Sequence, residues 1–377
     1  MTIAQQRSIR ILQTVGGMNR GGIETWLMNV LRHIDRDRFQ IDFLVHTTEP
    51  CAYDREIRAL GSKIIPCLYP SKPWLYARNF RQILRKYGSY DVVHSQHYLF
   101  SGFILRLAAQ ENVPFKISHI HPLTDINDKR FLRSIYRKMM SRWTAKYATH
   151  IIAPSKNTLE SFRAICNCSA QQTDILYNGI ELERFSAKVD RIAIRQKFSL
   201  PVDKPIVIYV ARFAPHKNHL QMLRIAEQIN QERTEVHFVM VGSHGEVLKI
   251  LQEKTSQRKD ISILTGIEDI SGLLNAADLF FFPSLEEGFG VVAIEAAAAG
   301  LPIVATDLPT IREACSPSQH AFMFSPNDDE MARQNIMQIL NNEELRKKLS
   351  DEARQWATNF SIVQSVNKLV SIYEMCK

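Results

Sequence analysis

The sequence predicts an α/β protein with two doubly wound parallel sheets, each in a domain of its own. Short apolar runs typical of buried strands alternate with amphipathic helical segments along the chain. The alternation stops near residue 181 and begins again near residue 205. The length of 377 residues also favours two domains of ordinary size. We therefore expect two series of βα units, each with a parallel sheet between layers of helices.

The first series covers residues 1–180 and contains seven runs with the pattern of strands. The expected strands are residues 9–15, 41–45, 63–65, 91–94, 115–118, 151–153 and 175–177. Apolar residues at helical spacing predict helices at 23–33, 73–87, 100–109 and 129–147, and one more after residue 155. Gly21 and Gly22 lie in a glycine-rich turn between the first strand and the first helix. Their backbone N–H groups are candidates to approach an anionic ligand.

Residues 181–204 are polar and irregular in pattern, and we expect them to form a linker. The second series covers residues 205–360 and repeats the βα alternation. Its expected strands are residues 206–210, 236–241, 261–264, 279–282 and 303–305, and its expected helices are 217–229, 270–276, one from 291 and others from 328 onward. In open α/β sheets, ligands bind beyond the carboxyl ends of the strands. The turns that follow these strands are therefore the first places to search for a site.

Composition and charge exclude some functions and favour others. The chain is 45% apolar and 23% charged, as in ordinary globular proteins, and carries a formal charge of +8. No apolar run reaches the ~18 residues that a membrane span needs, and the N-terminus lacks the apolar core of a signal peptide, so we expect a cytoplasmic protein. The positive charge favours an acidic partner such as a nucleotide diphosphate or anionic lipid. Zinc-finger spacing and aromatic RNA-binding motifs are missing, so nucleic acid is not expected.

A buried apolar strand, a glycine turn and a helix follow one another between residues 279 and 300. Gly288 and Gly290 flank Phe289 and permit a tight turn with close approach of the backbone to a ligand. The start of the following helix favours an anion, because its free N–H groups and its dipole point there. All three residues of this turn are candidates for ligand binding.

Two carboxylates, Glu287 and Glu295, lie in this turn and early in this helix. Carboxylates do not suit a phosphate alone, but they accept hydrogen bonds from hydroxyl groups. A ligand with hydroxyls beside its phosphates satisfies both features, and a nucleotide sugar has that chemistry. The alternative is an ordinary βα unit with two solvated glutamates.

The motif P-S-x-x-E-G-F-G-x-x-x-x-E-A-x-A-x-G, from Pro283 to Gly300, resembles the retaining glycosyltransferases of family 4. The resemblance implies the GT-B fold, in which two Rossmann-like domains face a central cleft. It implies transfer of a hexose from a UDP- or GDP-sugar donor in the second domain to a hydroxyl acceptor in the first. It also implies that Glu287 holds sugar hydroxyls, that Glu295 holds the ribose, and that a last helix at about 361–377 packs back on the first domain.

Arg212 and Lys217 follow the first strand of the second series, in an R-x4-K pattern that in the family contacts the donor diphosphate. A departing nucleoside diphosphate gains negative charge as the glycosidic bond breaks, and fixed cations stabilise that charge. The alternative is a pair of surface charges. Two cations would replace a metal ion, so we expect neither a metal nor another cofactor. In the family the turn at Gly242 borders the nucleotide, and we expect the same here.

His119 and His121 close a strand of the first series, and we expect them to point to opposite faces, so that one of them faces the ligand. The family places a histidine near this point beside the transferred sugar. In one branch the local pattern I-A-H-S-H-N resembles residues 117–122 here. On that resemblance His121 is the catalytic candidate and His119 the second choice. The alternative is a structural histidine at a strand end, and we expect that role for His94 and His97.

The expected helix 129–147 carries seven basic residues interleaved with apolar ones. Such a helix either lies on an anionic membrane or packs its apolar face on the sheet and solvates its charges. The first arrangement would suit a lipid-linked acceptor and a peripheral location at the inner face of a membrane. The second suits a glycan or small-molecule acceptor equally well.

The resemblance implies front-face displacement with retention of configuration, in which the departing phosphate takes the acceptor's proton. Two other functions fit parts of the sequence. A nucleotide-sugar epimerase of similar fold would need a further acid and base beside the sugar. A non-catalytic nucleotide-sugar-binding protein would be favoured by a broken donor motif, but all four charged members of that motif are present, Arg212, Lys217, Glu287 and Glu295.

Overall fold

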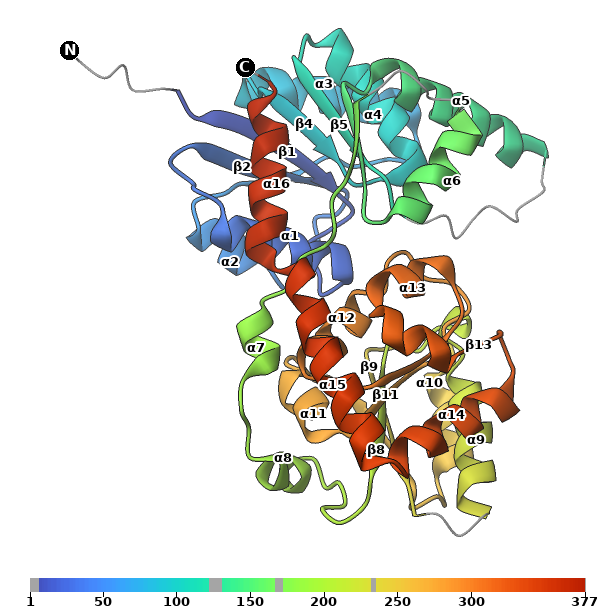
Figure 1. Ribbon diagram of the computed structural model, residues 1–377. Coiled ribbons are helices and arrows are strands. Elements are labelled where there is room, and N and C mark those ends of the chain that lie inside the picture. The colour runs from blue at the N-terminus through green and yellow to red at the C-terminus, as the bar shows by residue number, and fades with distance from the viewer. Residues whose placement is uncertain (1–6, 122–130, 167–171, 232–234, 377) are drawn as a thin grey trace. The chain divides into compact units, whose positions relative to one another are not determined.

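The computed structural model describes residues 7–121, 131–166, 172–231 and 235–376. It divides the chain into two compact units. The first comprises residues 1–179 together with Ile362–Lys377, and the second comprises Ile180–Ser361. Each unit is built on a parallel sheet with helices on its faces (Figure 1).

The sheet of the first unit has the strand order β3-β2-β1-β4-β5-β6-β7, and its pairs are parallel. Its strands are β1 (Ile9–Val15), β2 (Phe39–Val45), β3 (Ile64–Pro66), β4 (Val92–Ser95), β5 (Phe115–His119), β6 (His150–Ala153) and β7 (Gln172–Ile175). Strand order reverses beside β1, which pairs with both β2 and β4. Such a reversal leaves room at the carboxyl edge of a doubly wound sheet.

Helices cover both faces of this sheet because successive strand residues point to opposite sides. Ile11 joins a core that includes residues of α1 and α16, whereas Leu12 joins a core that includes residues of α3 and α4. The helices are α1 (Gly22–His33), α2 (Asp54–Ala59), α3 (Pro73–Tyr87), α4 (Ser101–Gln110), α5 (Phe131–Tyr147), α6 (Lys156–Cys166) and α16 (Ile362–Glu374). A short 3-10 helix, η1 (Tyr98–Phe100), precedes α4.

The C-terminal helix α16 lies along α1 in the first unit (Figure 1). Trp26 of α1 donates its indole N–H to the Ser365 hydroxyl at 3.0 Å, and that hydroxyl donates to the Tyr177 carbonyl at 2.8 Å. Tyr373, near the end of α16, is fully buried. The last helix therefore contributes both apolar area and buried polar groups to a sheet that begins with residue 9.

The sheet of the second unit has the order β10-β9-β8-β11-β12-β13 and is also parallel. Its strands are β8 (Ile206–Val210), β9 (His237–Gly242), β10 (Ile261–Thr265), β11 (Leu279–Phe282), β12 (Ile303–Thr306) and β13 (Met323–Phe324). Its α-helices are α7 (Leu182–Ser186), α8 (Arg191–Lys197), α9 (His219–Gln231), α10 (Leu248–Thr255), α11 (Ser271–Ala276), α12 (Val291–Ala298), α13 (Pro309–Ala314), α14 (Asp329–Leu340) and α15 (Glu343–Ala357). Three 3-10 helices complete it: η2 (Pro215–Lys217), η3 (Pro317–Phe322) and η4 (Thr358–Phe360).

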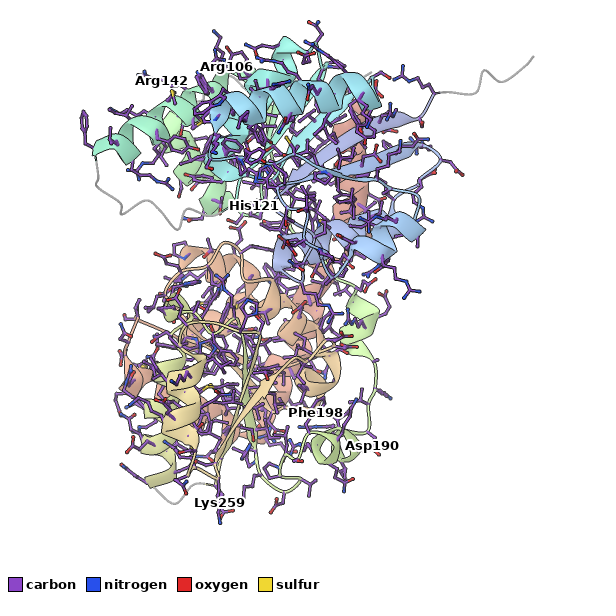
Figure 2. All side chains as sticks on the ribbon, turned by 180° about the vertical axis from the view of Figure 1, so that it is seen from behind. Arg106, His121, Arg142, Asp190, Phe198 and Lys259 are labelled. Carbon is purple, nitrogen blue, oxygen red and sulfur yellow. The ribbon has the colours of Figure 1, made fainter. Side chains whose placement is uncertain are left out.

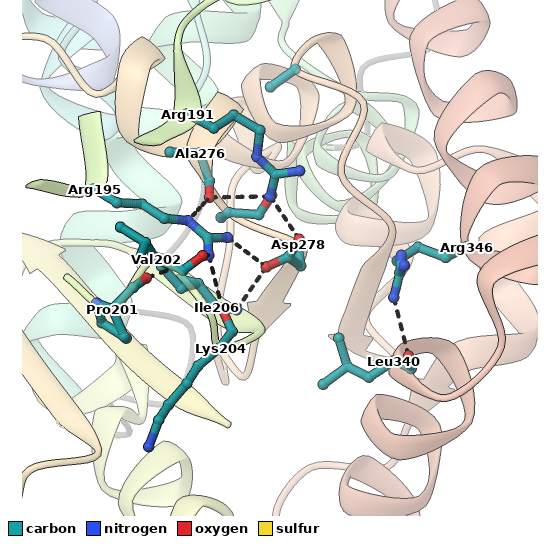
Figure 3. Close-up of polar contacts among 12 residues, drawn as sticks. Arg191, Arg195, Pro201, Val202, Lys204, Ile206, Ala276, Asp278, Leu340 and Arg346 are labelled. Atoms are coloured by element: carbon teal, nitrogen blue, oxygen red, sulfur yellow. Dashed lines mark hydrogen bonds and ion pairs between the residues drawn. The ribbon is translucent and has the colours of Figure 1, made fainter. Parts of the chain in front are cut away.

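Residues 181–204, expected to form a linker, belong to the second unit, where α7 and α8 pack against α11. Arg195 of α8 is buried and reaches Asp278 at 2.8 Å, and it also donates to the carbonyls of Ala276 and Lys204 at 2.9 Å each (Figure 3). Arg191 contacts the other oxygen of the same carboxylate at 2.6 Å. The sequence pattern missed this arrangement because the guanidinium groups bind main-chain oxygens, which leave no signal in residue type.

Candidate active site

The expected donor residues collect at the carboxyl edge of the second sheet. β9, β8 and β11 are neighbours and parallel, so the turns that follow them lie side by side. Arg212 follows β8, Gly242 ends β9, and Glu287 follows β11. Three stretches that are distant in sequence therefore border one edge.

The turn between β11 and α12 depends on Gly290. Its φ is +74°, in the left-handed region, and an added Cβ would lie 3.1 Å from the ring of Phe282. Phe289 is buried and packs on Phe360 with ring centroids 5.6 Å apart. We expected Phe289 to contact the donor. Because its side chain anchors the turn instead, any contribution of Phe289 to ligand binding is restricted to its main chain.

Lys217 and Glu287 form an ion pair in which both side chains are largely buried. Tyr209 holds the two loops together, since its hydroxyl donates to the Lys217 carbonyl at 2.9 Å and lies 2.8 Å from the Ser284 hydroxyl. Thr310 fixes the far side by donating to the Glu287 carbonyl at 3.0 Å. The two groups expected to hold diphosphate and sugar hydroxyls are thus in contact with each other and held in place from behind.

Arg212 is exposed at the same edge. Among the described residues no carboxylate pairs with it, so its guanidinium is open to a ligand. Lys217 lies in η2, before the αL residue Asn218, and the helix begins only at His219. The expected helix start at residue 217 was therefore two residues early. Lys217 does not oppose the dipole of α9 from within its first turn.

Glu295 lies in α12, one residue past its first turn, and is half-buried. Burial raises the pKa of Glu295 to about 7, with the Arg184 guanidinium lowering it and the Asp269 carboxylate raising it. Arg184 and Asp269 themselves pair at 3.1 Å. Sequence reasoning missed this pair. Arg184 lies in α7, within the expected linker, and Asp269 is distant from it in sequence. The carboxyl group of Glu295 takes no hydrogen bond from the described residues, so its oxygens are available to ligand hydroxyls.

Gly242 and Gly245 let the loop after β9 pack on the loop after β8. A Cβ at Gly242 would lie 2.1 Å from the Ala211 carbonyl oxygen, and one at Gly245 would lie 2.1 Å from the Phe213 carbonyl oxygen. Both distances are far shorter than any real carbon contact. These glycines therefore position the backbone that carries Arg212.

Gly21 and Gly22 begin α1 in the first unit, Gly21 as its extended N-cap. An added Cβ at Gly22 would meet nothing within 4 Å, whereas one at Gly21 would meet the Glu24 carboxylate. Burial raises the pKa of the Glu24 carboxyl. The first turn of α1 is thus open at Gly22 and bordered by an acidic side chain.

Five histidines gather at the carboxyl edge of the first sheet. His94, His119 and His121 stack in sequence, with ring centroids 5.4 Å and 4.7 Å apart, and His46 stacks on His97 at 4.3 Å. The expectation that His119 and His121 point to opposite faces was wrong, because residues two apart in an extended chain share a face. His119 is fully buried, whereas 7% of the surface of His121 is exposed, which favours His121 as the residue that meets a ligand. Burial lowers the pKa of His121 to about 4, so the ring is neutral near pH 7.

The described part of the chain offers neither a cluster of metal ligands nor a helix that could span a membrane. No group of three His, Cys, Asp or Glu side chains in that part of the chain is arranged to bind a metal ion. No helix there is both long and apolar enough to cross a bilayer.

Known proteins resemble this chain in sequence and fold. The profile described as Glycosyltransferase Family 4 matches residues 20–184, and that described as Glycosyl transferases group 1 matches residues 190–356. EpsF of Bacillus subtilis (strain 168), provisionally named a glycosyltransferase, is 32% identical over 309 residues, which is 79% of this chain and 79% of EpsF. The UDP-Gal:alpha-D-GlcNAc-diphosphoundecaprenol alpha-1,3-galactosyltransferase of Escherichia coli is 25% identical over 77% of this chain and 76% of its own length.

A solved structure of Anabaena Alr3699/HepE, in complex with UDP and glucose, superposes with a TM-score of 0.82 at 17% identity, covering 97% of this chain and 100% of HepE. That likeness extends over both parallel-sheet units. Together with the identity to EpsF and the two family profiles, it establishes the relationship over most of the chain. The protein is a glycosyltransferase of family 4 and has the GT-B fold.

Proposed function

We propose that this glycosyltransferase is retaining and moves a hexose from a UDP- or GDP-sugar to a hydroxyl acceptor without a metal ion. The observation that carries the proposal is the Lys217–Glu287 pair, with the open Arg212 guanidinium at the same sheet edge. One group has the charge for a diphosphate and the other has the acceptors for sugar hydroxyls. The turn between β11 and α12, which carries Glu287, also offers the free backbone N–H groups at the start of α12 to an anionic ligand.

In the proposed reaction the bond between C1 of the sugar and the β-phosphate oxygen breaks, and C1 bonds to the acceptor oxygen on the same face. The acceptor's proton passes to the departing diphosphate, so no separate protein base is required. Arg212 and Lys217 stabilise the charge that grows on the diphosphate. As Lys217 turns toward the phosphates, the Glu287 carboxylate is released and can accept hydrogen bonds from the sugar hydroxyls. His121 orients the sugar or stabilises its positive charge.

Glu295 is the proposed partner of the ribose. A carboxylate can accept hydrogen bonds from two hydroxyl groups at once. The carboxyl oxygens of Glu295 accept no hydrogen bond from the described residues. A uracil nucleotide is the preferred donor in this proposal, because the Escherichia coli relative is named for UDP-Gal and the HepE structure contains UDP. The sugar itself is left open among hexoses.

The proposed acceptor is a hydroxyl of a glycan, a lipid-linked saccharide or a small molecule, with the lipid-linked class favoured. The relative from Escherichia coli is named for a diphosphoundecaprenol-linked sugar. We place the protein in the cytoplasm, in peripheral contact with an anionic membrane surface. The support for that contact comes from α5.

The way α5 packs argues against the alternative in which its apolar face covers the sheet. Its buried side includes the small residues Ser141 and Thr144, and a Cβ on Gly102 of α4 would lie 2.3 Å from the Met140 carbonyl oxygen. Met140 is buried beside them, but four other large apolar side chains of α5 are exposed, with Phe131 at 77%. Close helix contact through this short buried stretch leaves those four side chains on the surface.

The exposed face of α5 combines apolar and basic residues. Leu132, Ile135 and Met139 join Phe131 on it, and the exposed cations are Lys138, Arg142 and Lys146. α5 contains no acidic residue. Figure 2 labels Arg142 beside Arg106, which lies over the Trp143 ring at 4.4 Å. An apolar stripe with flanking cations suits an anionic bilayer surface, where the cations reach lipid phosphates. Lys129 and Arg130, counted in this helix from the sequence, lie outside the described residues.

The testing experiment measures hydrolysis and transfer with a panel of UDP- and GDP-sugars, with and without a chelator. A nucleotide that raises the melting temperature should match the base of the active donor, and activity should survive the chelator. Loss of all activity in chelator, restored by manganese, contradicts metal independence. Thermal stabilisation by a nucleotide sugar that is neither hydrolysed nor transferred indicates a non-catalytic binding protein. Interconversion of the free sugar nucleotide indicates an epimerase.

A further inference from the structure

A chain of buried hydrogen bonds joins the C-terminal helix to His121 within the first unit. Gln13 Nε2 lies 2.8 Å from the Tyr373 hydroxyl oxygen and 3.0 Å from His94 Nδ1, and the same hydroxyl lies 2.9 Å from that nitrogen. Gln96 Nε2 donates to Gln13 Oε1 at 3.0 Å, and Gln96 Oε1 lies 2.8 Å from His121 Nε2. All five side chains are buried. The path starts on α16 and ends at the candidate ligand-binding histidine.

The positions of the hydrogens follow from the partners. The Gln13 Nε2 amino group can only donate and lies 3.0 Å from His94 Nδ1, so that nitrogen accepts and carries no proton. Because Gln13 Nε2 faces His94 and Tyr373, Gln13 Oε1 faces Gln96. Gln96 must therefore donate to this oxygen from its own Nε2. The remaining Gln96 oxygen can only accept, so His121 must donate from Nε2.

We propose that this chain fixes His121 as the neutral tautomer with its proton on Nε2, and that Gln96, Gln13 and Tyr373 are positioning residues for it. Nδ1 then keeps its lone pair and receives no hydrogen bond from the described residues. It is the ring atom left to accept a hydrogen from a ligand hydroxyl. That ligand step rests on the proposed function, in which His121 meets the transferred sugar, whereas the tautomer does not depend on it.

A fixed tautomer matters because, in a neutral imidazole that exchanges between its two tautomers, Nδ1 is an acceptor only part of the time. The partner of one ring nitrogen sets what the other can do. The stacked His119 ring further restricts rotation of His121. The site therefore has its acceptor in place before a ligand arrives, which lowers the cost of ordering it. The C-terminal helix becomes part of the site through one hydroxyl group.

The test compares two tyrosines. Tyr373→Phe removes the hydroxyl that holds Gln13 and His94. Tyr76→Phe is the matched control, because Tyr76 is also fully buried in the first unit. Its hydroxyl lies 3.0 Å from His46 Nε2, and neither residue belongs to the series of hydrogen bonds that joins Tyr373 to His121. The readout is the imidazole ¹⁵N spectrum of the full unliganded protein, with His121 assigned by its loss in His121→Asn.

The wild-type spectrum should place the His121 proton on Nε2, Tyr373→Phe should mix the two tautomers, and Tyr76→Phe should leave His121 unchanged. In transfer assays Tyr373→Phe should lower kcat about tenfold, the lower end of what removing a histidine's orienting partner costs, with UDP affinity unchanged. A proton on Nδ1 in the wild type, or a Tyr373→Phe spectrum identical to wild type, overturns the proposal. If no protein shows transfer, the proposed function fails and the spectra still decide the tautomer.

Gln96→Glu gives a second test that does not rely on losing a side chain. The new carboxylate can still accept from His121 Nε2 but cannot donate to Gln13. A negative partner favours the protonated ring, so both nitrogens of His121 should carry protons at neutral pH. Where titration shows residue 96 to be ionised, a His121 that stays neutral with its wild-type tautomer contradicts the proposed contact with residue 96.

Discussion

The Lys217 ammonium group contacts the Glu287 carboxylate at the carboxyl edge of the second sheet. Each group neutralises the other, and Tyr209 and Thr310 hold their main chains in place. A diphosphate would have to compete for Lys217 and would in turn release Glu287. In the proposed function the pair would therefore link phosphate binding to sugar recognition through a single exchange of partners.

Removing Arg212 should affect catalysis without affecting stability. We expect Arg212→Ala to lower kcat about a hundredfold, because losing one fixed group that stabilises developing charge costs ~3 kcal/mol. Its melting temperature should stay near wild type, since the side chain is exposed and forms no ion pair with the described residues. Lys259→Ala, an exposed cation before the amino end of β10 (Figure 2), is the matched control for kcat at saturating donor. A normal kcat with only a raised KM makes Arg212 a binding contact and no more.

Lys217→Ala should lower kcat to a similar extent and also lower stability. It leaves the largely buried Glu287 carboxylate without its partner, at a cost of ~1–3 kcal/mol in the free energy of unfolding. The double variant with Arg212→Ala should lose less kcat than the sum of the singles, because both cations serve one ligand. Strict additivity would argue that the two act on different groups.

Glu295 should make both stability and nucleotide binding depend on pH. Its folded pKa of about 7 lies above the ordinary value of 4.5, so between these values the unfolded chain binds fewer protons than the folded protein. Stability from this group therefore falls as pH rises through that window, by at most ~3 kcal/mol, and levels off above pH 7. Glu295→Gln should stabilise the unliganded protein at pH 8 and have little effect at pH 5, as denaturant titrations can show.

The same variant should weaken nucleotide binding at high pH. In the proposed function ionised Glu295 accepts hydrogen bonds from the ribose hydroxyls, so wild-type affinity for UDP should rise through pH 7 relative to that of Glu295→Gln. The comparison between the two proteins cancels the titration of the UDP phosphates. Parallel pH profiles would remove Glu295 from the nucleotide site.

The exposed face of α5 should bind anionic vesicles. Unmodified protein should sediment with phosphatidylcholine vesicles that contain phosphatidylglycerol, but not with phosphatidylcholine alone. Binding should fall with salt as charges are screened beyond ~8–10 Å. Ile135→Ser should weaken it about tenfold, since burying such a side chain stabilises by ~1.5–3 kcal/mol. Ile250→Ser in the second unit is the matched control, at 43% exposure against 47% for Ile135. Failure of the unmodified protein to bind at low salt makes the face structural, without bearing on soluble-donor hydrolysis.

Arg195 should be a main support of the second unit. Arg195→Ala leaves Asp278 with one arginine and removes four hydrogen bonds to main-chain carbonyls, and breaking a buried pair of this kind costs ~3–5 kcal/mol. Arg346→Ala, which removes one contact at the surface of the same unit (Figure 3), should cost under ~1 kcal/mol. Equal unfolding midpoints for the two variants would contradict the structural role of residues 181–204.

The sequence by itself determined the two parallel sheets, the strand–turn–helix at Gly290 and which charged residues are the candidates for donor binding. These features are local: an apolar run, a glycine that adopts a φ of +74° without strain, and side chains that directly follow a strand. The GT-B fold followed from the same motifs through their resemblance to a known family.

Only the tertiary structure decided which of these groups meet. Lys217 and Glu287 are 70 residues apart, and Gln13 and Tyr373 are 360 apart, and no local pattern records either contact. The sequence also did not reveal that residues 181–204 pack within the second unit, and it left two arrangements of the faces of α5 open. Arginines that bind main-chain oxygens carry no signature of their partner, and the partner of a helix face is set by what packs against it. Parallel sheets bring distant strand ends to one edge, and that convergence produces the site.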